Sequence, residues 1–233
     1  SRAAMSIENA RLYENLLVSK EDLEKANASL EENFRQTIVA FALALEENDQ
    51  YTRGHSERVS EYSRLVARGL GMSTEEETTV VQAALMHDIG KIGIRHEHLN
   101  KEGPLTTEEV AMFRHHPDKG KRILEPIPFL AKLIPGAQCH HEHFAGTGYP
   151  QGLAGEEIPL LGRIIAVADT YDAMTTDRAY RKALPHEVAI SELRKCAGTQ
   201  FDPRLVEIFI LELEKEHMVQ DMEKEEFILR PVS

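Results

Sequence analysis

Histidine and acidic residues occur together at three places in the sequence where they could bind metal ions. The adjacent pairs are His87-Asp88, His115-His116 and His140-His141, and each lies at the predicted end of a helix or just before a glycine-rich loop. Imidazole nitrogens combined with carboxylate oxygens suit Mn, Fe or Zn, whereas Mg and Ca prefer oxygen ligands alone. Because a carboxylate has two oxygens and can bridge two ions, His87-Asp88 is compatible with a two-metal site.

Asp169 is a further candidate ligand because it interrupts the apolar run from Ile164 to Ala168. A carboxylate buried in such a run costs several kcal/mol unless it is paired or bound to a metal. The alternative is that Asp169 caps backbone N–H groups, but a ligand role would also account for the surrounding histidines. His55, early on its own predicted helix, is a candidate as well. We expect ordinary surface or core roles for His96, His98, His143, His186, His217 and Cys139.

Composition argues against several classes of function. The chain has 233 residues, 39 of them acidic and 27 basic, and a net charge of −12. We therefore expect no nucleic-acid partner, and an anionic ligand would need a local cationic site such as metal ions or arginines. Cys139 and Cys196 form no C-x-x-C pair or disulfide framework, which favours a reduced, cytoplasmic setting. The longest charge-free stretches fall short of the ~20 residues that a membrane span needs.

The elements that must position these residues begin with a long N-terminal helix. Between residues 12 and 37, two series of positions alternate in steps of four and three, which is the a/d repeat of a coiled coil. The alternative is a single amphipathic helix that lies on its own domain. The apolar seam is narrow and has weak layers at Ser19 and Asn33, so we favour a parallel dimer. The seam positions are Leu12, Leu16, Ser19, Leu23, Ala26, Leu30, Asn33 and Thr37.

Helical periodicity continues beyond residue 37. No segment alternates with period two for long, so we predict an all-α fold. Ser73 and Thr106 are each followed by acidic residues, as at the start of a helix, and residues 145–159 contain enough glycine and proline to predict a loop. The predicted helices cover residues 37–47, 52–70, 74–86, 107–116, 119–134, 160–175, 185–197 and 203–217.

The sequence contains a series of seven motifs. Their residues and their order along the chain resemble the HD-GYP family, a branch of the HD phosphohydrolase superfamily that hydrolyses the bacterial messenger cyclic di-GMP. The resemblance covers about residues 37–217 and implies an HD-domain helical bundle. The motifs are His87-Asp88-Ile-Gly-Lys91, His115-His116-Pro117, His140-His141-Glu142, Gly146-Thr-Gly148-Tyr149-Pro150, Asp169-Thr-Tyr-Asp172, Asp177-Arg178-Ala-Tyr180-Arg181 and Gln200-Phe201-Asp202-Pro203.

The resemblance also implies roles for individual residues. It implies that Lys91 contacts the scissile phosphate and that Asp88 bridges the metal ions. Arg178 and Arg181 are three residues apart and can face one way on a helical turn to bind phosphate, although such a pair in isolation is more often a solvated surface. The implied metal ligands are His55, His87, Asp88, His116, His140, His141 and Asp169. The implied substrate-binding residues are Lys91, Gly148, Tyr149, Pro150, Arg178 and Arg181.

Two positions depart from the family pattern. Some members bind a third metal through a Glu one helical turn before the residue that matches His55, whereas this sequence has Tyr51 there. We therefore expect two divalent transition-metal ions per chain, Fe or Mn. The residue before the first glycine of the loop is often Asp or Asn in the family and is Ala145 here, which removes a hydrogen-bonding side chain from the rim of the site.

These observations predict a bacterial, cytoplasmic cyclic di-GMP phosphodiesterase. We expect a hydroxide bridging the two ions to attack phosphorus in line with the departing ribose 3′-oxygen, giving linear pGpG or, after a second cut, GMP. Residues 1–36 would be a dimerising signalling helix, 37–217 the phosphodiesterase domain and 218–233 a C-terminal tail. Residues 3–16 resemble the last helix of GAF sensor domains, which implies a sensor upstream in a longer protein. The alternatives are an HD enzyme for another nucleotide, a catalytically silent receptor and a purely structural dimerisation module.

Overall fold

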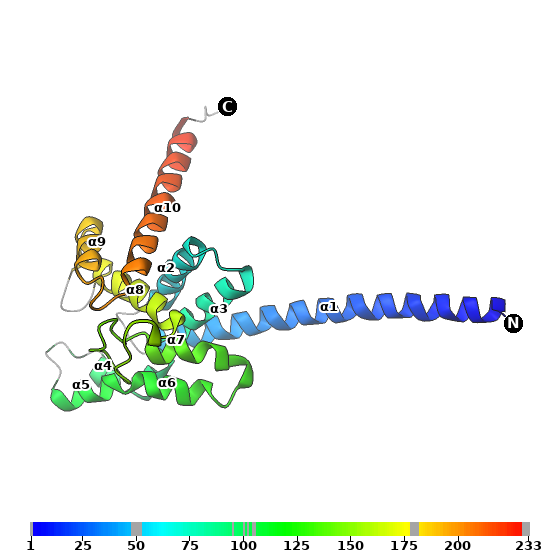
Figure 1. Ribbon diagram of the computed structural model, residues 1–233, viewed down its shortest axis with the longest axis horizontal. Coiled ribbons are helices and arrows are strands. Elements are labelled where there is room, and N and C mark those ends of the chain that lie inside the picture. The colour runs from blue at the N-terminus through cyan, green and yellow to red at the C-terminus, as the bar shows by residue number, and fades with distance from the viewer. Residues whose placement is uncertain are drawn as a thin grey trace. The chain divides into compact units, whose positions relative to one another are not determined.

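All regular elements in the described part of the chain are helices (Figure 1). The computed structural model describes residues 2–47, 53–94, 96–99, 101, 103, 106–177 and 182–229, with side chains described as far as residue 218 except that of His96. In these ranges the extended segments pair only at two isolated bridges, Ala145 with Ala154 and Ala197 with Phe201. The predicted all-α class is therefore confirmed.

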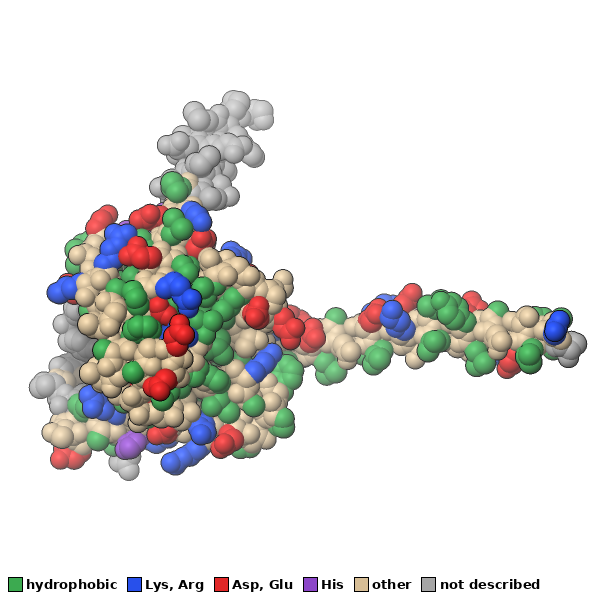
Figure 2. Space-filling view, viewed as in Figure 1, with side chains coloured by type: hydrophobic (Ala, Val, Ile, Leu, Met, Phe, Trp, Pro, Cys, Tyr) green, Lys and Arg blue, Asp and Glu red, His purple; other side chains and the backbone are tan. Residues whose placement is uncertain are grey.

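The chain divides into two compact units, residues 1–40 and 41–233. The first unit lies within helix α1 (Arg2–Glu46), which confirms the predicted long N-terminal helix. The four leucines of its predicted seam, Leu12, Leu16, Leu23 and Leu30, are 58% to 65% exposed. Figure 2 shows apolar side chains interspersed with charged ones along this helix. None of the helices among the described residues has the length and apolar character to cross a membrane.

The second unit contains the remaining helices, most of them short. In chain order they are α2 (His55–Gly69), α3 (Thr74–Leu85), η1 (Ile89–Gly93), α4 (His96–Leu99), α5 (Thr107–Arg114), α6 (His116–Leu124), η2 (Pro128–Leu133), α7 (Ile134–Cys139), η3 (Gly155–Glu157), α8 (Leu160–Thr175), α9 (His186–Lys195) and α10 (Pro203–Leu229). The single helix expected over residues 119–134 is instead split among α6, η2 and α7. Pro126, Pro128 and Pro135 explain the division, because proline lacks an N–H and its ring clashes with the preceding helical turn.

Two capping boxes fix where the helices before the candidate site begin. At α3, the Ser73 hydroxyl accepts the Glu76 N–H and the Glu76 carboxylate accepts the Ser73 N–H. Thr106 and Glu109 form the same reciprocal pair at the start of α5. Each box satisfies helix N–H groups that have no partner within the helix. The segments that end at His87 and His116 are therefore anchored at their starts.

The core holds α2 and α8 against each other and against α10. Val66, Val167 and Phe209 have no exposed surface. Tyr62, Tyr171 and Phe209 meet edge to face with ring centroids 5.0 to 5.9 Å apart. Burying these aromatic and aliphatic side chains stabilises the packing of three helices that are far apart in sequence. Two of them, α2 and α8, carry candidate ligands.

Candidate metal centre

Asp88 lies between two groups of histidines. Its Oδ2 atom is 3.4 Å from Nε2 of His87 and 3.9 Å from Nε2 of His55. Its Oδ1 atom is 3.2 Å from Nε2 of His116 and 4.0 Å from Nε2 of His140. Each oxygen of one buried carboxylate thus faces a different pair of imidazoles, which is the arrangement that a carboxylate bridging two ions requires.

The structure brings together all the residues predicted as ligands. Their donor atoms form three overlapping groups in which all atoms lie within 4.8 Å of one another. The groups are His55, His87 and Asp169; His116, His140 and His141; and His87, Asp88 and His140. The first two share no residue, so they define two separate positions for an ion, with Asp88 between them. Their role as ligands stays a prediction.

Backbone hydrogen bonds orient three of these imidazoles. Nδ1 of His87 donates to the Ala84 carbonyl at 2.6 Å, and Nδ1 of His116 donates to the Phe113 carbonyl at 2.7 Å. Nδ1 of His140 donates to the Ala137 carbonyl at 3.1 Å. A carbonyl can only accept, so each Nδ1 carries the hydrogen, and Nε2 of the neutral ring presents a lone pair.

Two of these lone pairs face each other when their rings are neutral, and a third has no hydrogen-bond partner. Nε2 of His116 lies 3.2 Å from Nε2 of His140. Nε2 of His87 is buried without a hydrogen-bond partner. Buried acceptors normally have a partner, and facing lone pairs repel. A bound cation would accept the lone pairs of these nitrogens, so the donor set fits a transition-metal ion.

Burial and neighbouring charges keep four of the donors in the protonation states that bind metals. Burial lowers the pKa of His87 and lowers the pKa of His141 to about 3. It also lowers the pKa of His140 well below its usual value. For Asp88, burial would raise the pKa, but Lys91 and the nearby imidazoles outweigh burial and hold that pKa well below its usual value. Neutral imidazoles at His87, His140 and His141 and an ionised carboxylate at Asp88 are therefore the expected forms.

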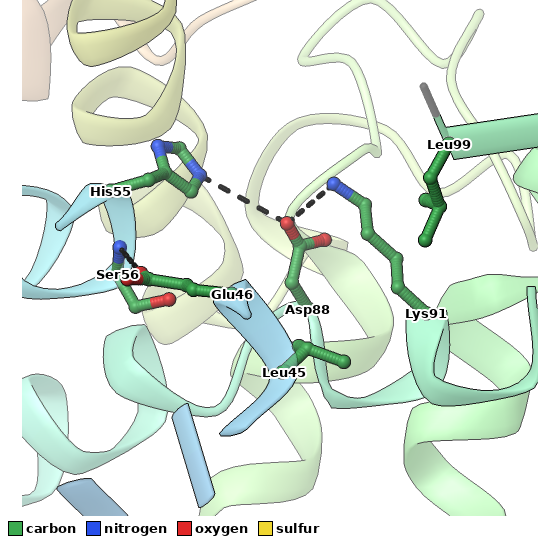
Figure 3. Close-up of a pocket in the computed structure, with 7 residues that line it drawn as sticks. All are labelled: Leu45, Glu46, His55, Ser56, Asp88, Lys91 and Leu99. Carbon is green, nitrogen blue, oxygen red and sulfur yellow. Dashed lines mark hydrogen bonds and ion pairs between the residues drawn. The ribbon is translucent and has the colours of Figure 1, made fainter. Parts of the chain in front are cut away.

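Helix η1 places Lys91 beside Asp88. Lys91 Nζ donates to Asp88 Oδ2 at 2.6 Å, and Figure 3 shows Lys91 and His55 pointing to the same carboxylate oxygen. Gly90 allows η1 to pack closely against α6, because a Cβ there would collide with the carbonyl oxygen of His116. These residues border a small pocket that is lined by Leu45, Glu46, His55, Ser56, Asp88, Lys91 and Leu99.

The glycine-rich loop lies against the second ligand group. The Tyr149 ring stacks on His141 with centroids 4.9 Å apart, and the Arg114 guanidinium lies 5.3 Å from the centre of the Tyr149 ring. Gly148 is required by close approach, since a Cβ would overlap the backbone of Glu142. The predicted substrate residues Gly148, Tyr149 and Pro150 thus adjoin the candidate centre. Arg178, Arg181 and Tyr51 lie outside the described residues.

Sequence reasoning missed four charged residues that support the site. Glu142, 2% exposed, accepts the backbone N–H groups of residues 151, 152 and 153 at 2.7 to 3.1 Å. Glu46 accepts the N–H groups of Gly54 and Ser56, both at 2.7 Å, and so caps the helix that begins with His55. Asp172 accepts from His55 Nδ1 at 2.7 Å and also binds Arg58. Two signals were available: the spacing of Asp172 from Asp169, three residues on a predicted helix, and the presence of Glu142 and Asp172 in the family motifs.

Comparison with known proteins identifies the family. The model of the family described as HD domain matches residues 39–205. The chain belongs to the HD-domain family. This confirms the predicted relationship to HD phosphohydrolases, and the helical arrangement around His87 and Asp88 is that of an HD domain.

Named relatives of this HD domain are phosphodiesterases. It is 40% identical over 183 residues to the cyclic di-GMP phosphodiesterase response regulator RpfG of Xanthomonas campestris, covering 78% of this chain and 48% of the relative. It is 38% identical over 180 residues to 3'3'-cGAMP-specific phosphodiesterase 3 of Vibrio cholerae, covering 77% of this chain and 39% of the relative. The chain therefore spans less than half the length of these two curated relatives.

A solved structure shares the fold of this HD domain. It is the crystal structure of a cyclic GMP-AMP specific phosphodiesterase of V. cholerae, V-cGAP3, with a TM-score of 0.61 and 19% sequence identity. The match covers 84% of this chain and 53% of that chain. At this level of identity the likeness concerns the fold.

Proposed function

We propose that this HD domain is a metal-dependent phosphodiesterase that hydrolyses a cyclic dinucleotide, with cyclic di-GMP as the favoured substrate. The observation that carries the proposal is the position of Asp88, whose two oxygens face separate pairs of imidazoles. The name of RpfG, a cyclic di-GMP phosphodiesterase response regulator, supports the substrate class. The reaction would give linear pGpG or, after a second cut, GMP.

The proposed cofactor is a pair of divalent transition-metal ions, Fe or Mn. One ion would be held by His55, His87 and Asp169, and the other by His116, His140 and His141. Asp88 would contact both ions. When bound, such ions lower the pKa of a water to give a nucleophile at neutral pH and offset charge on the phosphate.

Lys91 is the proposed cationic contact for the scissile phosphate. Its ammonium already lies 2.6 Å from Asp88 Oδ2, in the pocket shown in Figure 3. A positive group there would stabilise charge that develops on the non-bridging oxygens. Tyr149, held by the loop beside His141, together with Gly148, Pro150, Arg178 and Arg181, would contact the rest of the nucleotide. These cationic groups would allow an acidic chain to bind an anionic substrate.

A second candidate substrate is 3'3'-cGAMP, which the name of the V. cholerae relative supports. Both dinucleotides contain the same phosphodiester linkages, so the metal ligands and Lys91 would serve either. They differ in one base. Side-by-side turnover of the two dinucleotides under identical conditions separates the candidates.

We propose in addition that the domain works as a homodimer in the bacterial cytoplasm. Exposed leucines along α1 support a parallel coiled coil between two copies. Residues 1–36 would then join an upstream sensor to a phosphodiesterase domain at residues 37–217, with residues 218–233 as a tail.

Metal content and hydrolysis measured on one preparation, purified aerobically and anaerobically, test the proposal. We expect close to two transition-metal ions per chain and conversion of cyclic di-GMP to pGpG. The double variant His87→Ala/Asp88→Ala should lose hydrolysis and keep a helical circular dichroism spectrum, while His98→Ala should behave like the wild type. Undiminished turnover in the double variant, or a folded wild type that binds no metal, would refute the proposal.

A further inference from the structure

His55 is oriented differently from three of the other candidate ligands. His87, His116 and His140 each donate Nδ1 to a carbonyl three residues earlier in the same local segment. His55 donates Nδ1 to a side chain instead, the Asp172 Oδ2 atom at 2.7 Å, which lies 117 residues later in the sequence.

The position of His55 in its helix explains this difference. His55 is the first residue of α2, so no turn of that helix precedes its ring. His116 also begins a helix, but it follows α5 directly and donates to the carbonyl of Phe113 in that helix. The Nε2 atom of His55 nevertheless has to face Asp169, 3.4 Å away, and Asp88, 3.9 Å away. An acceptor from another element is therefore needed to fix the ring, and α8 supplies it.

Two pairs of residues connect α2 and α8, and within each pair the two residues are three positions apart on one helix. His55 and Arg58 lie on α2, and Asp169 and Asp172 lie on α8. Arg58 binds Asp172 through both Nε, 2.5 Å from Oδ1, and Nη2, 3.1 Å from Oδ2. Asp172 is 1% exposed, and a buried carboxylate is stable only when it is paired and hydrogen-bonded. The fork of Arg58 fixes the carboxylate in the plane from which Oδ2 reaches His55.

We infer that Asp172 and Arg58 are positioning residues for one of the two ion positions, the one formed by His55, His87 and Asp169. The inference rests on the metal centre of the proposed function. Asp172 holds the His55 ring and its tautomer so that Nε2 points into the centre, and Arg58 holds Asp172. Carboxylates that orient a metal-binding histidine typically change metal affinity about 10- to 100-fold when they are removed. The position formed by His116, His140 and His141 has no such dependence on Asp172.

Manganese titration of the metal-free full chain tests this inference. Bound Mn²⁺ is counted by equilibrium dialysis for the wild type, Asp172→Asn and Arg58→Gln. The matched control is Asp202→Asn, since Asp202 is also a buried carboxylate paired with an arginine, Arg163, at 2.7 Å. We expect one Mn²⁺ to bind about 10- to 100-fold more weakly in Asp172→Asn, with a smaller effect in Arg58→Gln. The second ion in both variants, and both ions in Asp202→Asn, should bind as in the wild type.

Double variants assign the weakened position. His116→Ala disables the other position, so in the double variant His116→Ala/Asp172→Asn the remaining Mn²⁺ should bind more weakly than in His116→Ala alone. In Asp169→Asn/Asp172→Asn, Mn²⁺ binding should be the same as in Asp169→Asn alone. The inference is overturned if Asp172→Asn binds both ions as the wild type does, or weakens both equally. If Asp172→Asn does not fold, Arg58→Gln decides by the same criteria. A wild type that binds no Mn²⁺ would instead refute the metal centre itself.

Discussion

The Nε2 atoms of His116 and His140 face each other at 3.2 Å, although each ring already donates its Nδ1 hydrogen to a backbone carbonyl. When both rings are neutral, both facing nitrogens carry lone pairs, and the contact is repulsive unless a cation accepts them. Burial prevents water from taking that role, because His140 is 2% exposed. The metal-free fold is therefore destabilised at the position where an ion is expected.

Removing metal should lower the thermal stability of the wild type. A ligand present at 100 times its Kd contributes about 2.7 kcal/mol to the free energy of unfolding at one site. Calorimetric melting with and without a chelator measures the effect. His98→Ala should respond to the chelator as the wild type does, and His140→Ala should respond less. An unchanged Tm after complete removal of metal would contradict the expectation.

Replacing Lys91 should slow hydrolysis without removing metal. We expect Lys91→Met to reduce kcat about 10²- to 10³-fold, the usual effect of losing one group that stabilises transition-state charge. The chain should keep its two ions, because Lys91 donates to Asp88 and offers no lone pair to a metal. Lys132→Met is the control, since Lys132 is exposed and lies over the Phe129 ring. Wild-type kcat in Lys91→Met would exclude the proposed role.

Glu46 should stabilise the start of α2, and its neighbour Glu47 should not. Glu46 is 7% exposed and accepts two backbone N–H groups, whereas the Glu47 side chain is 80% exposed. We expect Glu46→Gln to lower the free energy of unfolding by about 1–3 kcal/mol. Glu47→Gln should have almost no effect. Chemical denaturation of the two variants measures the difference, and equal midpoints would show that Glu46 does not anchor the helix.

Glu142 should matter for substrate binding through the loop that carries Tyr149. Its carboxylate accepts three backbone N–H groups of residues 151–153. In Glu142→Gln an amide would face these donors. Losing these hydrogen bonds should reduce the free energy that holds the loop in its ordered conformation by about 1.5–3 kcal/mol. This corresponds to a KM at least about tenfold higher. Steady-state kinetics compare Glu142→Gln with Glu156→Gln, a change at an exposed position nearby. If both variants have the same KM, Glu142 does not organise the loop for binding.

The two cysteines should differ in reactivity. Burial, reinforced by Glu142 and Asp118, raises the pKa of Cys139 to about 11, and Cys139 is 3% exposed. The thiolate is the reactive form, so below pH 11 Cys139 stays protonated and unreactive. At pH 8 an alkylating reagent should modify Cys196, which is partly exposed, and leave Cys139 intact. Mass spectrometry of the folded chain, with Cys196→Ser as control, reads the result. Rapid modification of Cys139 would disprove it.

Local sequence was sufficient to predict most helices and to single out candidate histidines and acids, whereas the complete ligand set was implied by the family resemblance. Ser73 and Thr106 indicated helix starts that the structure realises as capping boxes. His87 and Asp88 were predicted as candidate metal ligands because a histidine and an acidic residue lie together beside an apolar segment. Such signals are visible within a few residues, so they need no knowledge of the fold.

Contacts between distant segments were not predictable in this way. Arg58 and Asp172 are 114 residues apart, and each alone resembles a surface charge on an amphipathic helix. Glu142 supports the loop by accepting backbone N–H groups, which every sequence provides, so its role has no side-chain partner to suggest it. The break of the predicted helix at 119–134 was readable from its prolines, but the resulting short helices depend on tertiary packing.

Anomalous diffraction from crystals of the Mn²⁺-loaded chain tests whether Asp88 bridges two metal ions. We expect two anomalous peaks per chain on opposite sides of the Asp88 carboxylate. One should contact His55, His87 and Asp169, and the other His116, His140 and His141. A single peak, or peaks that do not share Asp88, would contradict a bimetallic centre bridged by this residue.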